Sequence, residues 1–153
     1  MRQSEPILKV KGLKQYFEIS GRYTVRAVDG VDFVIYPGET YGLVGESGSG
    51  KSTIGRSLIR LYDPTAGHID FNGMDISGKM DRTTERRLRT EMQMIFQDPM
   101  ACLNPRKKVG EIIAQGLDIH HLYHTRAERK QEVASMLEKV GLDPEHADRY
   151  PHQ

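Results

Sequence analysis

The most informative part of this 153-residue chain is Gly45-Glu46-Ser47-Gly48-Ser49-Gly50-Lys51-Ser52-Thr53. It has the spacing G-x-x-x-x-G-K-[ST], in which glycines let a loop curl until its backbone N–H groups point inward. The short apolar segment 40–44 before the loop predicts a buried strand, and the apolar spacing after it predicts a helix over 51–61. A loop that joins a strand to the N-terminus of a helix is typical of phosphate-binding sites.

This loop predicts a site that binds a nucleoside triphosphate together with Mg²⁺. The first N–H groups of a helix have no partner within the helix, and the helix dipole favours negative charge there. Lys51 supplies a positive charge for the β- and γ-phosphates, and Ser52 offers its hydroxyl to Mg²⁺. The alternative, a glycine-rich turn with an exposed lysine, is disfavoured by the strand-then-helix context.

The composition predicts a soluble cytoplasmic protein of about one domain. The 22 Lys and Arg residues nearly balance the 21 Asp and Glu residues, which excludes a disordered charged tail and argues against a general nucleic-acid binder. Cys102 is the only cysteine, so an internal disulfide and a four-cysteine zinc site are excluded. No apolar run approaches the roughly 20 residues that span a bilayer.

The remaining pattern predicts strands first and helices later. Apolar segments predict strands over 7–17, 24–36, 68–71 and 92–96. Leu8 and Val10 are expected on one face, and Asn72-Gly73 indicates a hairpin turn. Residues 109–117 predict a short helix. Thr125 and Glu128 form a capping-box pattern before a second helix that Gly141 ends. The apolar stripe expected in its core is Val133, Met136, Leu137 and Val140.

Two polar clusters allow a functional and a structural interpretation. The basic cluster Arg82, Arg86, Arg87 and Arg89 could bind nucleic acid or lipid. Interleaved Glu85 and Glu91 favour a solvated helix face instead. The second cluster is His120, His121 and His124 with Glu128. It could be a metal site, but a polar surface turn is favoured because no carboxylate partner is evident at metal-binding distance.

The chain resembles the ATPase subunit of ABC transporters over essentially its whole length. Residues 42–53 are similar to the Walker A segment of that family, and residues 94–99 are similar to its Q-loop. The stretches that resemble the oligopeptide/dipeptide permease subgroup are 27–31, 96–106 and 149–153. Cys102 stands where that subgroup is expected to have a small hydroxyl residue.

The resemblance implies an α/β fold: a P-loop NTPase core with an antiparallel β portion, and a helical subdomain. Residues 1–98 would form the nucleotide-binding core, and residues 99–153 would begin the helical subdomain. Phe17 would stack on the adenine, although its neighbour Tyr16 is an alternative, and packing on the strand face would be the structural interpretation. Gln97 would reach Mg²⁺ and the attacking water, whereas from sequence alone it is a polar turn residue.

The resemblance also implies that the protein binds and hydrolyses ATP to drive peptide import at the cytoplasmic face of a bacterial inner membrane. Its partners would be a second ATPase subunit, identical or not, transmembrane permease subunits and, indirectly, a substrate-binding protein, with no nucleic acid. Alternatives are import of nickel or another small solute, and an ABC-type ATPase of DNA repair or translation.

The family's signature motif, its Walker B Asp-Glu and its switch histidine are not found in this sequence. We therefore expect these residues to be the N-terminal part of a longer ATPase that binds nucleotide but does not turn ATP over alone.

Overall fold

The computed structural model describes residues 5–21 and 23–153, which form two compact units, Met1–Met94 and Ile95–Gln153. Each unit has its own cluster of buried apolar side chains. The fold combines helices with an antiparallel sheet, as expected for the α/β class.

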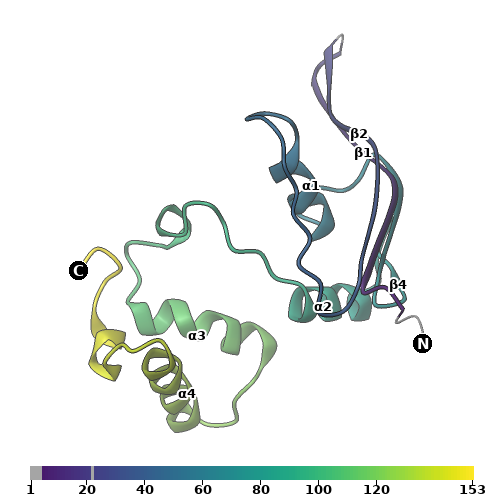
Figure 1. Ribbon diagram of the computed structural model, residues 1–153. Helices are drawn as coiled ribbons and strands as arrows, with labels where there is room; N and C mark the ends of the chain where they lie inside the picture. Colours follow the sequence, from purple (N-terminus) through teal and green to yellow (C-terminus); the bar gives the residue numbers. More distant parts are fainter. Residues whose placement is uncertain (1–4, 22) are drawn as a thin grey trace. The chain divides into compact units, whose positions relative to one another are not determined.

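The first unit is built on a four-stranded antiparallel sheet with the strand order β2-β1-β3-β4 (Figure 1). Its strands are β1 (Leu8–Ser20), β2 (Tyr23–Ile35), β3 (Ala66–Phe71) and β4 (Met74–Asp75). Asn72 and Gly73 join β3 to β4 with φ angles of 50° and 74°. A two-residue hairpin turn of this kind needs positive φ at both positions, and the predicted hairpin is confirmed.

A bulge in β1 changes which of its residues face the core. The register against β2 shifts between Val10 and Leu13, and Gly12 within this interval has a φ of 60°. The buried residues are Leu8 and Val10 before the bulge, as predicted, and Leu13 and Gln15 after it. The extra residue therefore reverses the in–out alternation along the second half of the strand.

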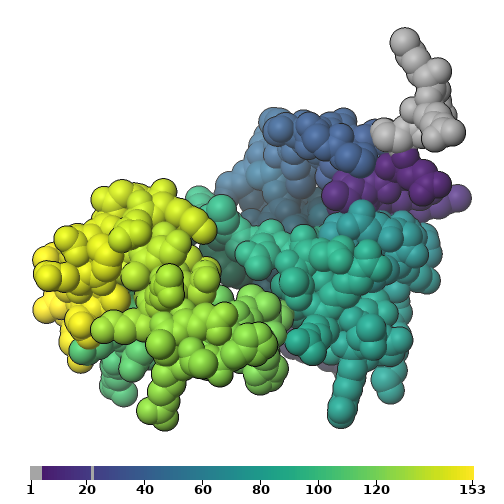
Figure 2. Space-filling view, turned by 90° about the horizontal axis from the view of Figure 1, so that it is seen from below, coloured from purple at the N-terminus to yellow at the C-terminus, as the bar shows by residue number. Residues whose placement is uncertain are grey.

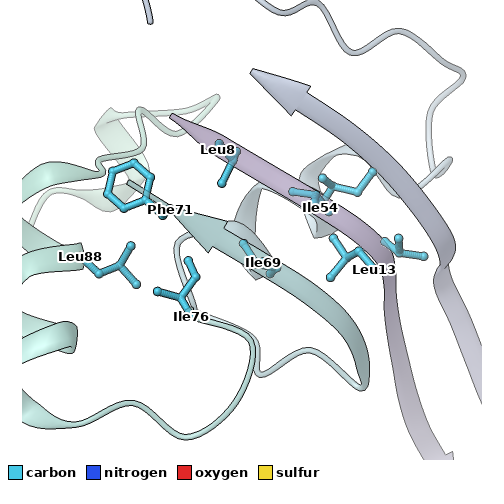
Figure 3. Close-up of a cluster of buried hydrophobic side chains, with 9 residues drawn as sticks. Leu8, Leu13, Ile54, Ile69, Phe71, Ile76 and Leu88 are labelled. Carbon is cyan, nitrogen blue, oxygen red and sulfur yellow. The ribbon is translucent and has the colours of Figure 1, made fainter. Parts of the chain in front are cut away.

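The helices α1 (Lys51–Leu58) and α2 (Arg82–Glu91) complete the core of the first unit. Ile54 of α1 and Leu88 of α2 point toward apolar side chains of the sheet (Figure 3). The buried set is Leu8, Val10, Leu13, Val28, Ile54, Ile69, Phe71, Ile76 and Leu88. After α1, the buried guanidinium of Arg60 donates to the carbonyls of Ser77 at 2.7 Å and Gly78 at 3.0 Å. The C-terminal end of α1 is thereby fixed to the segment that follows β4.

Two strand predictions are wrong. Residues 40–44 and 92–96 form no strand, and Val44 and Ile95 are 95% and 94% exposed. A strand requires a neighbour that pairs with its N–H and C=O groups, and none of the described strands pairs with either segment. Apolar composition alone therefore did not produce a sheet element here.

The second unit is helical. It contains α3 (Val109–His120) and α4 (Arg126–Lys139), with 3₁₀ turns η1 (Met100–Cys102) and η2 (Pro144–Asp148). Ala114 and Leu117 of α3 pack with Val133 and Leu137 of α4. Met136 and Val140 are 37% and 71% exposed, so half of the predicted stripe is wrong. A helix that packs against few neighbours buries a narrow stripe only.

A side-chain cap marks the start of α4, and an ion pair joins α4 to α3. The Thr125 side chain accepts the N–H of Glu128 at 3.1 Å, which confirms the predicted cap of α4. Arg129 of α4 donates to both carboxylate oxygens of Asp118 of α3, at 2.6 and 2.7 Å. This bidentate pair is the main reason that the pKa of Asp118 falls from its ordinary 3.8 to about 2.

Candidate nucleotide-binding site

The predicted phosphate-binding loop ends at Gly50, the N-cap of α1. Gly48 and Gly50 have φ angles of 81° and 91°, a conformation that side chains disfavour. No side chain caps α1, and no acidic residue lies in its first turn. Within the part of the chain that the structure describes, no side-chain cap or first-turn carboxylate therefore neutralises the positive end of this helix. Such an end can bind an external anion.

The end of the loop touches β2 where that strand has a bulge. A Cβ atom on Gly50 would lie 2.3 Å from the carbonyl oxygen of Ala27. The register of β2 against β1 skips Ala27, which lies between the paired residues Arg26 and Val28. This contact fixes the start of α1 against the hairpin, and it leaves no room for a side chain. The sequence alone could not reveal the role of Ala27, because the bulge has no glycine to mark it.

Lys51 folds back across the loop. Its Nζ donates to the carbonyl oxygens of Gly45 at 2.7 Å and Glu46 at 2.5 Å, and to Ser49 Oγ at 3.2 Å. A Cβ atom on Gly45 would lie 2.7 Å from the same Ser49 Oγ. The loop is thus curled tightly around one ammonium group. Its glycine-lined backbone, its cation and the uncapped helix together fit a chain of phosphates.

The other predicted residues of the loop lie around this turn. The N–H of Ser49 donates to the carbonyl of Glu46 at 3.2 Å, which closes the curl. Ser47, Gly48 and Ser49 are exposed, as is Ser52 in the first turn of α1. Thr53 is half-buried. Hydroxyl oxygen is a ligand that Mg²⁺ accepts, so the exposed Ser52 fits the predicted metal role.

A buried polar contact links α1 to β1. Ser57 is fully buried, and its Oγ lies 2.9 Å from the carbonyl of Thr53 and 3.3 Å from Oε1 of Gln15. Gln15 is 4% exposed. Because a buried polar group without a partner is costly, this contact specifies how the helix lies on the strand. Neither residue stood out in the sequence.

The adjacent aromatic residues Tyr16 and Phe17 have different surroundings. The hydroxyl of Tyr16 donates to Asp29, and Arg26 lies 5.5 Å from the centre of its ring. Phe17 instead packs edge-on against Tyr62, in the segment after α1, with ring centres 5.1 Å apart. Phe17 is therefore the aromatic whose ring contacts Tyr62 of the segment that follows α1. Its role as the adenine platform stays a prediction.

Gln97 lies in the second unit and is exposed. The next residue, Asp98, accepts the N–H of Ala101 at 3.2 Å, so Gln97 directly precedes a short turn. Cys102 in that turn is exposed and has a free thiol. The proposed reach of Gln97 to Mg²⁺ stays a prediction.

Two of the basic residues of α2 form ion pairs along the helix. Arg87 pairs with Glu91 at 2.6 Å and Arg89 with Glu85 at 3.6 Å, each four residues apart. Arg89 also donates to the carbonyl of Ile59 at 2.6 Å. The teal part of the chain in Figure 2, which includes α2, lies at the surface of that view. These contacts agree with a solvated, charge-paired helix face.

Glu128, the acidic member of the histidine cluster, has a structural role. Glu128 accepts the backbone N–H of His124 at 2.8 Å, so its carboxylate helps to begin α4. Among residues 5–21 and 23–153, no group of three or more His, Cys, Asp or Glu residues could hold a metal ion.

In the same residues no helix is long and apolar enough to cross a bilayer.

Residues 28–153 match the family model described as ABC transporter. The chain belongs to the ABC transporter family. It is 56% identical over 150 residues to the oligopeptide transport ATP-binding protein OppF of Bacillus subtilis, covering 98% of this chain and 49% of that protein. It is 44% identical over 155 residues to the dipeptide transport ATP-binding protein DppF of Lactococcus lactis, covering 100% of this chain and 49% of that protein. The chain spans about half the length of these ABC transporter relatives.

A solved structure of an ABC transporter cassette shares the fold. The dimeric, post-hydrolysis structure of the ATP-binding cassette MJ0796 with ADP and Pi superposes with a TM-score of 0.80 at 24% identity. The superposition covers 95% of this chain and 62% of that one. The α/β ATPase fold predicted from the sequence is thereby confirmed.

Proposed function

We propose that this chain is the nucleotide-binding part of an ATP-hydrolysing subunit that energises import of oligopeptides or dipeptides. The observation that carries the proposal is the loop of residues 45–50: it curls around Lys51, is fixed to β2 through Gly50 and precedes a helix without a side-chain cap. The names of its ABC transporter relatives support the peptide cargo. Residues 1–98 form the nucleotide-binding core in this proposal, and residues 99–153 begin the helical subdomain.

The residues of the loop hold the nucleotide. Backbone N–H groups of residues 45–53 and the Lys51 ammonium bind the phosphates. Phe17 offers a ring face to the adenine. The side-chain oxygens of Ser52 and Gln97 bind Mg²⁺. When bound, ATP supplies the phosphoanhydride whose hydrolysis releases free energy, and Mg²⁺ neutralises phosphate charge. On binding, Lys51 would exchange its present carbonyl partners, Gly45 and Glu46, for phosphate oxygens.

The binding step is tested by titrating the chain with ATP and Mg²⁺ in a calorimeter. Lys51→Ala removes charge-assisted hydrogen bonds and lowers the affinity by about 10- to 100-fold. Lys139→Ala, an exposed lysine in the last turn of α4, is the matched control and leaves the affinity unchanged. Equal affinities of wild type and Lys51→Ala would contradict the proposed role of the loop.

The transport role is tested with partners. We propose a second ATPase subunit and transmembrane permease subunits as partners at the cytoplasmic face of the bacterial inner membrane. When the protein is purified from detergent extracts, membrane-spanning subunits should be recovered with it. Recovery of nucleic acid with the protein would instead favour an ATPase of DNA repair or translation. Steady ATP hydrolysis by the 153-residue chain alone, abolished in Lys51→Ala, would contradict the expectation that it binds without turnover.

A further inference from the structure

An aromatic contact joins the strand of the proposed adenine platform to the segment after α1. The rings of Phe17 and Tyr62 are 5.1 Å apart at an interplanar angle of 83°. Both side chains are half-buried. In an edge-to-face pair the positive ring edge of one partner meets the negative face of the other, so the contact restricts how either ring can turn.

Tyr62 is itself held by the last turn of α1. Its backbone N–H donates to the carbonyl of Arg56 at 3.3 Å, and its hydroxyl accepts from Arg56 Nη1 at 3.3 Å. The Arg56 guanidinium lies 6.0 Å from the centre of the Tyr62 ring. The orientation of Tyr62 is therefore set by the same helix whose N-terminus ends the phosphate-binding loop.

We propose that Tyr62 is a positioning residue that holds the Phe17 ring for stacking on the base of a bound nucleotide. This inference rests on the proposed function. A near-perpendicular contact leaves at least one face of Phe17 uncovered by Tyr62, and stacking requires such a face. The loop grips the phosphates at one end of α1, and Tyr62 at the other end fixes the base platform. One helix thus sets the distance between the two halves of the site.

The strength of the Phe17–Tyr62 contact determines how much its loss should change the affinity for nucleotide. When an edge-to-face aromatic pair orients a stacking ring, its loss should change the binding constant by about three- to tenfold. Tyr62→Leu keeps apolar volume beside Phe17 but removes the aromatic ring and the hydroxyl. Tyr62→Phe removes only the hydroxyl and its contact with Arg56, and it should restore most of the affinity.

The test compares ATP with inorganic tripolyphosphate, each with Mg²⁺, by calorimetry. Tyr62→Leu should weaken ATP binding about three- to tenfold and leave tripolyphosphate binding unchanged, because only ATP carries a base. Tyr23→Leu, an exposed tyrosine near the hairpin tip, is the matched control and should change neither affinity. Because the chain has no tryptophan, Phe17→Trp provides a single reporter whose emission ATP should change and tripolyphosphate should not. In that background, Tyr62→Leu should reduce the ATP-induced change and Tyr62→Phe should retain it.

The outcomes separate this inference from the proposed function. Equal ATP affinity in wild type and Tyr62→Leu, or equal weakening of ATP and tripolyphosphate, overturns the positioning role while Lys51→Ala still weakens both ligands. If wild type binds neither ligand, or if Lys51→Ala binds both as wild type does, the proposed function fails and the inference fails with it.

Discussion

Gly50→Ala tests whether the contact between the loop and the hairpin stabilises the first unit. A left-handed conformation costs a residue with a side chain about 1–2 kcal/mol, and Gly50 has a φ of 91°. The new Cβ would also lie 2.3 Å from the carbonyl oxygen of Ala27, so the backbone of β2 or α1 has to move. Such overpacking adds about 1–3 kcal/mol, which brings the expected loss of unfolding free energy to about 2–5 kcal/mol.

Gly48→Ala is the matched control for this substitution. Gly48 has a φ of 81°, but a Cβ there would meet nothing within 4 Å. Its expected cost is the conformational part alone, about 1–2 kcal/mol. Urea unfolding followed by far-ultraviolet circular dichroism measures both variants against wild type. If Gly50→Ala is no more destabilising than Gly48→Ala, the contact with Ala27 does not constrain the loop and the reasoning is refuted.

Three further substitutions test the core of the sheet, a helix cap and an ion pair. Leu13→Ala removes a fully buried side chain from the sheet and should cost about 2–5 kcal/mol in urea unfolding, whereas exposed Ile19→Ala should cost little. Thr125→Ala removes the cap of α4 and should cost about 1 kcal/mol; an unchanged thermal midpoint would contradict the capping role. Asp118 has its pKa lowered to about 2 from 3.8, so its contribution to stability is present above 3.8 and is lost as the pH falls toward 2. Asp118→Asn should reduce that pH dependence of the urea midpoint, and an identical pH profile in the variant would exclude the pair with Arg129 as its cause.

Local signals in the sequence predicted the parts of the fold that depend on neighbouring residues. The Asn72-Gly73 turn, the Thr125 cap and the start of α1 after Gly50 each follow from a backbone preference that the residues carry themselves. The fold of Lys51 back onto Gly45, six positions earlier, is local for the same reason, since the glycines between them allow the curl. Such features need no knowledge of distant segments.

Contacts between distant segments could not be predicted in this way. Residues 40–44 have the composition of a buried strand, yet Val44 is 95% exposed because none of the described strands pairs with it. The buried pair of Gln15 and Ser57 and the approach of Ala27 to Gly50 each join residues more than twenty positions apart along the chain. The type of a residue limits the environments in which that residue is stable. These contacts depend instead on which distant segment the fold brings beside the residue.

The choice between Tyr16 and Phe17 shows how one residue in a strand can change a functional prediction. Continuing the alternation of Leu8 and Val10 without interruption would place Tyr16 on the core side and Phe17 on the opposite side. The bulge at Gly12 reverses that alternation, and it is Phe17 that contacts Tyr62 after α1. An isolated glycine within a strand pattern is a recognised sign of a bulge, so the sequence did contain the signal that separates the two aromatics. The prediction that Phe17 is the adenine platform therefore rests on the bulge at Gly12.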